Sequence, residues 1–274
     1  MSIKKNKVTV AIPVRNGSDY LAETLNFLKN ASISEILISN NFSTDNTESI
    51  VKDFQNVRVI KPPTPLKMAE NWNFVTRHVN TEYFRLVSHD DLPKLESFEE
   101  HEKILDENPQ VGMVFSRRAL IIQGRTLTKT LSAGKFNSKS YESSLQLLEE
   151  VCRSGKNPCG ETFAVTLRSD LFQNPRNNVA WFGDEPFELD TWLQISRLMT
   201  IVEAPIDGGG FRVHLNSHSG SIPNYFLQGK KVVSWAKIQP EYQDLGKKRR
   251  LTLILLINFR SFMRFLAFRF IKFF

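Results

Sequence analysis

The first 116 residues alternate short apolar runs with stretches in which apolar residues recur every three or four positions. The runs are rich in β-branched or aromatic residues and predict strands at Val8–Ile12, Glu35–Ser39, Val57–Ile60, Tyr83–Val87 and Gly112–Ser116. The periodic stretches between them predict helices, with Ser18 as an N-cap and a capping box at Asp45–Glu48. Strands that alternate with helices across short connections indicate an α/β fold with a mainly parallel sheet.

Polar residues follow three of these strands directly. They are residues 13–17 after the first strand, Asn40 and Asn41 after the second, and residues 88–91 after the fourth. Ligands of parallel sheets bind outside the carboxyl ends of the strands. The three polar segments therefore predict one ligand site at that edge of the sheet.

The second half of the chain has a less regular pattern. Residues 124–140 are rich in Gly, Ser, Thr and Lys and indicate a mobile loop. Helices are predicted at 141–153 and 185–199, with a strand-like run at Thr162–Leu167 between them. Gly208 to Gly210 predict a flexible joint before Phe211–His214.

The net charge of +7 comes from the end of the chain. Eight of the 36 basic residues, and no acidic ones, follow Gly246, which leaves 28 basic against 29 acidic residues elsewhere. A near-neutral body argues against a nucleic-acid-binding domain, which carries a basic stripe on a folded face. The first thirty residues lack the pattern of a signal peptide. Cys152 and Cys159 match no metal spacing and are expected as free thiols in a reducing compartment.

The segment Leu251–Phe274 contains seven of the chain's 21 phenylalanines. On a helix, Arg260, Arg264, Arg269 and Lys272 fall within one half-turn arc. The opposite side is apolar and carries Leu255, Phe259, Phe262, Met263, Leu266 and Phe270. The apolar run is too short to cross a bilayer, so the pattern favours an interfacial helix attracted to anionic lipid. A terminal helix packed on the folded body, or on another subunit, is the alternative.

Asp90 and Asp91 are the first candidates for chemistry. Adjacent carboxylates repel each other unless a cation or hydrogen bonds compensate. A hard divalent ion, held by one or two carboxylates and by substrate phosphates, is the usual compensation, and it also neutralises the charge on a departing diphosphate. A solvated turn, or a cap for the next helix, is the alternative explanation of the pair.

Three segments resemble glycosyltransferase family 2: VTVAIPVRNGSDYLAETLNFL, EILISNNFSTDNT and MAENWNFVTRHVNTEYFRLVSHDDL. In the family's order, they contain a strand ending in Pro-x-x-Asn, a turn before Ser-Thr-Asp, and an Asp-x-Asp-type motif. Further on, FELDTWLQI is similar to the family's acidic segment before Trp-Leu, and FRVHLNSHS to its Arg-x-His segment. The resemblance spans about residues 7–220. It implies the GT-A fold, a Rossmann-like, mainly parallel sheet flanked by helices, to which this chain adds a C-terminal amphipathic helical tail.

The resemblance also implies roles for single residues. The nucleotide-sugar donor would be bound by Pro13, Val14, Arg15, Asn16, Asn40, Asn71 and Asp90. A divalent metal, Mn²⁺ or Mg²⁺, would be held by Asp91, with Asp90 beside it and His214 as a late contact. Asp190 best matches the base that deprotonates the acceptor hydroxyl, and Glu188 is the second choice. Asn40 stands where members commonly have an Asp that accepts a hydrogen bond from the nucleobase, so the base specificity stays open.

The implied reaction is an inverting transfer from a nucleoside-diphosphate sugar to a hydroxyl of a glycan or a polyprenyl-linked saccharide. It needs one general base and one stabilised leaving group. We expect it in surface-polysaccharide assembly, with the protein cytoplasmic and peripheral on the inner face of the cell membrane. Asn40 and the short Asp motif keep a nucleotide-sugar-binding or scaffolding protein without catalysis open. A nucleic-acid or membrane-binding module with an incidental α/β body is the third alternative.

The expected organisation has three parts. Residues 1–220 form the catalytic domain, with a nucleotide-sugar-binding half at 1–116 and an acceptor-side half at 117–220. Residues 221–246 are a connector. Residues 247–274 are the basic, amphipathic tail that binds an anionic membrane surface.

Overall fold

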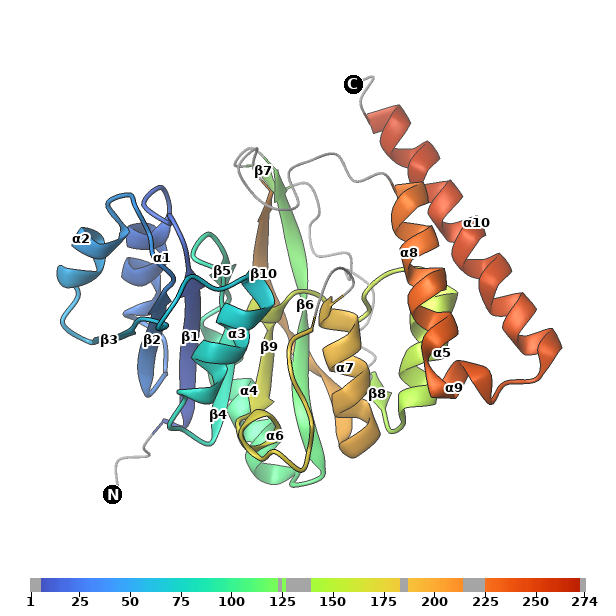
Figure 1. Cartoon of the computed structure of the whole chain (residues 1–274), viewed down its shortest axis with the longest axis horizontal. Helices are drawn as coiled ribbons and strands as arrows, with labels where there is room; N and C mark the ends of the chain where they lie inside the picture. The colour runs from blue at the N-terminus through green and yellow to red at the C-terminus, as the bar shows by residue number, and fades with distance from the viewer. Residues whose placement is uncertain (1–5, 123–124, 127–138, 183–186, 214–224, 272–274) are drawn as a thin grey trace.

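The computed structural model describes residues 6–122, 125–126, 139–182, 187–213 and 225–271. Its strands are β1 (Val8–Val14), β2 (Glu35–Asn40), β3 (Val57–Ile60), β4 (Tyr83–Leu86), β5 (Leu92–Pro93), β6 (Val111–Ile122), β7 (Arg125–Thr126), β8 (Ser140–Tyr141), β9 (Val165–Arg168) and β10 (Thr200–Val213). They form one sheet in the order β3-β2-β1-β4-β9-β6-β10-β5, with β7 on β6 and β8 on β10 (Figure 1). The predicted α/β class is confirmed.

Helices cover both faces of the sheet (Figure 1). One face packs against α1 (Leu21–Leu28), α2 (Thr47–Lys52) and α4 (Glu96–Glu107). The other packs against α3 (Met68–Arg77), α5 (Ser144–Ser154), α6 (Asp170–Gln173), α7 (Phe187–Leu198) and α8 (Tyr225–Ile238). Successive residues of β1 alternate between the two cores, as Val10 and Ala11 do. Because both faces are covered, every residue of β1 is buried, and all but Thr9 are apolar.

The predicted edge for ligands is confirmed by the strand pairing. β1 pairs in parallel with β2 and with β4, so the three strands end at the same edge. The strand predicted to stop at Ile12 continues through Pro13 to Val14. The last residue of β1 that pairs with β4 is Ala11, opposite Leu86. Beyond Ala11, β1 pairs only with β2. Pro13 has no N–H to donate to a second neighbouring strand, so it is tolerated there as it is on an edge strand.

The second half departs from the simple alternation. β9 is antiparallel to both β4 and β6, whereas β10 runs parallel to β6. The strand-like run Thr162–Leu167 is a 3-10 turn, η1 (Thr162–Ala164), followed by β9. The flexible joint predicted at Gly208–Gly210 is wrong, because these glycines lie within β10 and pair with β5 and β6.

Neither predicted cap forms at the N-terminal helices. α1 begins at Leu21 without a side-chain cap, and α2 at Thr47 likewise. Instead, Asp45 joins the two loops: it accepts hydrogen bonds from the Ser18 N–H (2.9 Å) and from the Thr47 hydroxyl (2.5 Å) and N–H (3.1 Å). Burial opposes ionisation of Asp45, but the hydrogen bonds from Thr47 and Ser18 outweigh it and hold the pKa of the carboxyl well below its usual range.

The segment expected to be a connector contains α8 and α9 (Pro240–Gln243), and it contributes to the core. Trp235, Ala236 and Tyr242 are buried there. α10 (Lys247–Ile271) runs alongside α8 at the end of the molecule opposite α2 (Figure 1). Their approach is close, because a Cβ on Gly229 would lie 2.2 Å from the Ser261 hydroxyl.

α10 has apolar side chains on a buried face and on an exposed face. Leu253 and Ile257 are buried against the body, so the helix packs as the alternative interpretation expected. A second set of apolar side chains is exposed: Leu251, Leu255, Phe259, Phe262 and Met263. Among the described helices, none has both the length and the apolarity needed to cross a membrane.

Removing the Asp45 carboxylate is expected to destabilise the fold. Asp45→Ala should lower the free energy of unfolding by about 1–2 kcal/mol, since it deletes a side-chain acceptor for two loop N–H groups. Asp53→Ala, on an exposed carboxylate at the end of α2, is the matched control. Because the pKa of Asp45 is depressed in the folded state, its contribution is complete above about pH 4 and declines as the pH falls further. Urea unfolding at pH 7 and pH 3 measures this difference, and equal losses for both variants would contradict the role of Asp45.

Candidate active site

The loop after β1 and the loop after β2 are interlocked by hydrogen bonds. The Asn16 N–H donates to the Ser43 hydroxyl (3.0 Å), and the Asn16 side-chain oxygen accepts from the Thr44 N–H (2.8 Å). The Gly17 N–H donates to the Thr47 hydroxyl (2.8 Å). Asn16 thus holds the loops together, in a left-handed conformation with φ of 56°. Of the other residues predicted in this loop, Pro13 and Val14 are buried in β1 and Arg15 is exposed.

Two predicted donor-binding asparagines also make bonds within the protein. The Asn40 side-chain oxygen accepts from the Ser43 N–H (3.1 Å), which orients the amide so that its NH₂ group is left to donate. Asn71 is buried on α3, and its oxygen accepts from the Ser39 hydroxyl (2.6 Å). Both residues lie where β2 ends, so the structure places them at the predicted edge.

The loop with Asp90 and Asp91 is anchored on both sides. It follows β4, the Asp91 N–H donates to the Ser88 carbonyl (3.2 Å), and β5 begins directly after Asp91. β5 pairs with the glycine stretch of β10, where Leu92 faces Gly210 and Pro93 faces Gly209. Asp91 is only 3% exposed, whereas Asp90 is half-buried. This loop, the loop after β1 and the loop after β2 therefore meet at one edge.

Glycine is required in β10 for this approach. Gly209 has a φ of +110°, and a Cβ there would lie 2.4 Å from the Leu92 carbonyl oxygen. An L-residue at this position would both be strained and push β5 away.

The structure adds Arg118 and Glu161, which were not predicted. The Arg118 guanidinium on β6 donates through Nε and Nη2 to both carboxylate oxygens of Glu161. Burial lowers the pKa of Arg118 to about 10, while the charges of Glu188 and Asp91 act in the opposite direction. The guanidinium is therefore a cation at neutral pH, paired with Glu161 and stabilised by the charges of Glu188 and Asp91. Two consecutive arginines after the apolar run Gly112–Ser116 were the signal that could have found it.

Asp190 and Glu188 lie in the first turn of α7 but have different surroundings. The Asp190 carboxylate accepts hydrogen bonds from Trp235 Nε1 on α8 (3.3 Å) and from Gln194 Nε2 (3.0 Å). Glu188 interacts electrostatically with Arg118, which also interacts with Asp91. The charge of Glu188 thus acts on Arg118, whereas the Asp190 carboxylate is bound by Trp235 and Gln194. His214 lies outside the described residues.

Asp91 and Asp90 offer carboxylate oxygens, which are the ligands that a hard divalent cation prefers. Within the described residues, no three His, Cys, Asp or Glu side chains gather into a group that could hold a metal ion. Mg²⁺ and Mn²⁺ need no such cage, because one or two carboxylates suffice when substrate phosphates supply the remaining oxygens. The pair at the strand end suits that mode of binding.

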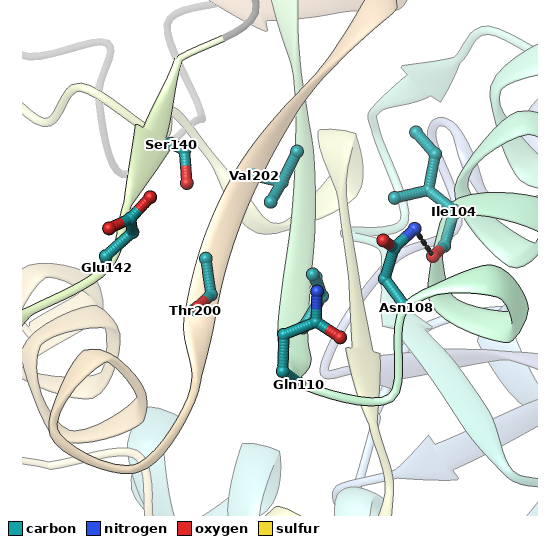
Figure 2. Close-up of a pocket in the computed structure, with 8 residues that line it drawn as sticks. Ile104, Asn108, Gln110, Ser140, Glu142, Thr200 and Val202 are labelled. Atoms are coloured by element: carbon teal, nitrogen blue, oxygen red, sulfur yellow. Dashed lines mark hydrogen bonds between the residues drawn. The ribbon is translucent and has the colours of Figure 1, made fainter.

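A pocket of about 360 Å³ lies elsewhere, at the amino ends of β6 and β10 (Figure 2). Its lining includes Asn108, Gln110, Thr200 and Glu142. None of the predicted site residues lines it. Since ligands of such sheets bind at the carboxyl ends of the strands, we place the candidate active site at the Asp91 edge.

Comparison with known structures supports the fold. The chain is similar to the crystal structure of residues 1–349 of S. aureus TarS, with a TM-score of 0.63 and 15% identity over 94% of this chain and 72% of TarS. The same TarS fragment has also been solved in complex with UDP-GlcNAc. The mannosyltransferase PcManGT from Pyrobaculum calidifontis, solved with GDP-Man and Mn²⁺, matches with a TM-score of 0.61 and 15% identity over 93% of this chain and 70% of PcManGT. No curated protein sequence matches the chain significantly.

The sheet order and the covering helices are those of the GT-A fold. The sequence profile of glycosyl transferase family 2 matches residues 9–171, more than half of the chain. The chain therefore belongs to glycosyl transferase family 2, and the predicted family and fold are confirmed.

Gly209→Ala is expected to disturb the Asp91 loop. The added methyl group meets the Leu92 carbonyl in a backbone conformation that L-residues avoid, so the free energy of unfolding should fall by about 2–3 kcal/mol. Gly246→Ala is the control, since a Cβ there has no atom within 4 Å. Thermal unfolding of both variants measures the effect. A Gly209→Ala protein as stable as the Gly246→Ala protein would contradict the close approach of β5.

Proposed function

We propose that this protein transfers a sugar from a nucleoside-diphosphate sugar to a hydroxyl group of a glycan or of a lipid-linked acceptor, with inversion at the anomeric carbon. The observation that carries the proposal is the position of Asp91, nearly buried at the carboxyl edge of the β2–β1–β4 sheet. The complexes of TarS with UDP-GlcNAc and of PcManGT with GDP-Man support a nucleotide-sugar donor.

The donor side of the site consists of the three strand-end loops. Asp91 and Asp90 would hold Mn²⁺ or Mg²⁺, which when bound neutralises negative charge on the diphosphate of the donor. The PcManGT complex with Mn²⁺ supports this choice of metal. The NH₂ group of Asn40 would donate a hydrogen bond to the nucleobase, where a carboxylate could only accept one. His214 stays a proposed late contact of the metal.

The acceptor side would be served by Glu188 as the general base. A base must reach the acceptor hydroxyl near the reacting carbon, and Glu188 is connected electrostatically with Arg118 and the Asp91 edge. The Asp190 carboxylate is engaged by Trp235 and Gln194, which suits a residue that fixes α7 on α8. We therefore place Glu188 before Asp190, reversing the order that the family resemblance implied.

Two carboxylate-to-amide changes separate these roles. Glu188→Gln should lower the transfer rate by about 10²–10⁴-fold, because the amide cannot take the acceptor proton. Asp190→Asn keeps an acceptor for Trp235 and should lower the rate less than about 10-fold. The assay is transfer or hydrolysis of a panel of nucleoside-diphosphate sugars with Mn²⁺ or Mg²⁺. A larger loss in Asp190→Asn would restore Asp190 as the base, and binding of a donor without any turnover by the wild type would favour the scaffolding alternative.

We also propose that α10 binds the surface of an anionic membrane and brings the enzyme to a lipid-linked acceptor. Its exposed face carries Leu255, Phe259 and Phe262, and the helix is rich in basic residues such as Lys247 and Arg260. Apolar side chains that enter the lipid interface, together with cations that attract anionic head groups, are the features of an interfacial helix. Figure 1 shows the carboxyl end of α10 at the same end of the molecule as β7, which follows the carboxyl end of β6.

Replacing exposed apolar residues of α10 should weaken membrane binding. The variant Leu255→Ser, Phe259→Ser, Phe262→Ser should sediment with phosphatidylglycerol vesicles at least about 10-fold less tightly than the wild type, because three apolar side chains no longer enter the lipid. Val59→Ser, Met68→Ser removes exposed apolar side chains elsewhere and serves as the control. Equal sedimentation of wild type and α10 variant would contradict the proposal, as would equal binding to purely zwitterionic vesicles.

A further inference from the structure

The segment that carries Asp91 is closed at its base by a buried arginine. This segment, residues 87–95, lies between β4 and α4. Arg85 on β4 donates from Nη1 to the Ser97 hydroxyl (2.7 Å) and from Nη2 to the Ser97 carbonyl (3.2 Å) on α4. The guanidinium therefore joins the strand before the segment to the helix after it.

Ser97 extends this link to the end of the segment. Its hydroxyl donates to the Lys94 carbonyl (2.6 Å), and its N–H donates to the same oxygen (3.1 Å). The Lys94 N–H in turn donates to the Gly208 carbonyl on β10 (3.0 Å). Arg85 and β10 thus fix the end of the segment from two sides.

The Arg85 guanidinium is itself held by neighbouring elements. Its Nε and Nη2 donate to the Thr166 hydroxyl on β9 (3.1 and 2.8 Å), and Nη2 also donates to Nδ1 of His101 on α4 (2.9 Å). Because an arginine can only donate, Nδ1 of His101 accepts, and its Nε2–H donates to the Ser116 hydroxyl on β6 (2.7 Å). The Phe98 ring packs against the guanidinium, with its centroid 3.9 Å from Cζ. The position of Arg85 is therefore set by β9, β6 and α4 together.

A buried cation is a costly way to fill a core position. Arg85 is fully buried, and the hydrogen bonds described above go to neutral groups. Burial lowers the pKa of Arg85 to about 9, so the side chain is still a cation at neutral pH. Apolar residues of similar volume often stabilise a core as well as buried charges do or better. The cost of Arg85 is therefore better explained by what it holds in place than by core stability.

We propose that Arg85 is a positioning residue for the carboxylate of Asp91: by joining β4 to α4, it sets where residues 87–95 present that carboxylate to a divalent cation. The inference rests on the proposed function, in which Asp91 holds Mn²⁺ or Mg²⁺ at the diphosphate of the donor. Small divalent cations tolerate little displacement of their ligands, because they require nearly octahedral geometry. Arg85 therefore contributes to metal-dependent nucleotide binding from within the core.

Arg168 provides a matched control at the other end of α4. From β9 it donates to the carbonyls of Leu105 (2.6 Å) and Asn108 (3.2 Å), where α4 ends, and to the carbonyl of Val111 (2.7 Å). Both arginines fix α4 to the sheet through carbonyl groups. Only Arg85 does so at the end of α4 that follows the segment with Asp91.

The test measures the Kd of UDP, GDP or CDP, whichever binds the wild type most tightly, by calorimetry with Mn²⁺ and again with EDTA. Arg85→Met should raise the Kd with Mn²⁺ at least about 10-fold and the Kd with EDTA less than about 3-fold, as expected for a residue that orients a metal ligand. Arg168→Met should change both values less than about 3-fold, because it acts far from the segment. Arg85→Lys should recover part of the affinity with Mn²⁺, since an ammonium group can replace some of the donors.

A second variant tests the same link if Arg85→Met does not fold. Ser97→Ala removes the hydroxyl between Arg85 and the Lys94 carbonyl, and should raise the Kd with Mn²⁺ about 3-fold or more. Ser196→Ala on α7 is its control, because the Ser196 hydroxyl is also buried and also donates to the carbonyl three residues earlier, that of Leu193 (2.9 Å).

The outcomes separate the inference from the proposed function. Equal effects of Arg85→Met and Arg168→Met on the Kd with Mn²⁺ would overturn the inference and leave the proposed function intact. Equal changes with Mn²⁺ and with EDTA in Arg85→Met would do the same, as would wild-type affinity in Ser97→Ala where Arg85→Met does not fold. A wild type whose affinity for all three nucleotides is unaffected by Mn²⁺ would overturn the proposed metal site, and the inference with it.

Discussion

The contact on which the site depends is the pairing of β5 with the glycine stretch of β10. Two adjacent carboxylates at a strand end repel each other, so their loop must be held by its backbone on both sides. β4 holds one side, and β5 holds the other by lying so close to Gly209 that no Cβ fits between them. Because the same stretch of β10 pairs with β6, it also sets the position of Arg118 relative to Asp91. β10, from the second half of the chain, thus positions a loop of the site that the first half of the chain supplies.

Residues of similar polarity divide into two groups at this edge. Asn16, Asn40, Asn71 and Asp45 direct hydrogen bonds to neighbouring loops and helices, and so give the edge its shape. Asp91, Glu188 and Glu161 are carboxylates whose charges favour the cationic form of Arg118, with which Glu161 is paired. A polar residue after a strand therefore indicates where a site lies, but its partners decide whether it binds substrate or holds the backbone.

Local pattern predicted the β2–β1–β4 core and its edge, because β-branched runs and short crossovers leave few alternatives. It did not predict the glycine stretch of β10, since three glycines look the same in a flexible joint and in a strand that another backbone approaches. Arg118 was missed for a related reason: its partner Glu161 is distant in sequence and meets it only through tertiary packing. For the C-terminal tail, the sequence left two interpretations open. Its pattern suited both packing and membrane binding, and the structure shows one buried face, with Leu253 and Ile257, and one exposed apolar face.

The central claim is that Asp91 makes the carboxyl edge a site for a divalent cation and a nucleoside diphosphate together. Electron paramagnetic resonance of Mn²⁺ tests it most directly, because free Mn²⁺ gives a sharp signal that decreases when the ion is bound. The signal should fall when UDP, GDP or CDP is added to the wild type with Mn²⁺, beyond the fall caused by the nucleotide alone. The Asp91→Asn protein should show no such additional decrease with the same nucleotide. Equal decreases for the two proteins, or none for the wild type with any of the three nucleotides, would contradict the account.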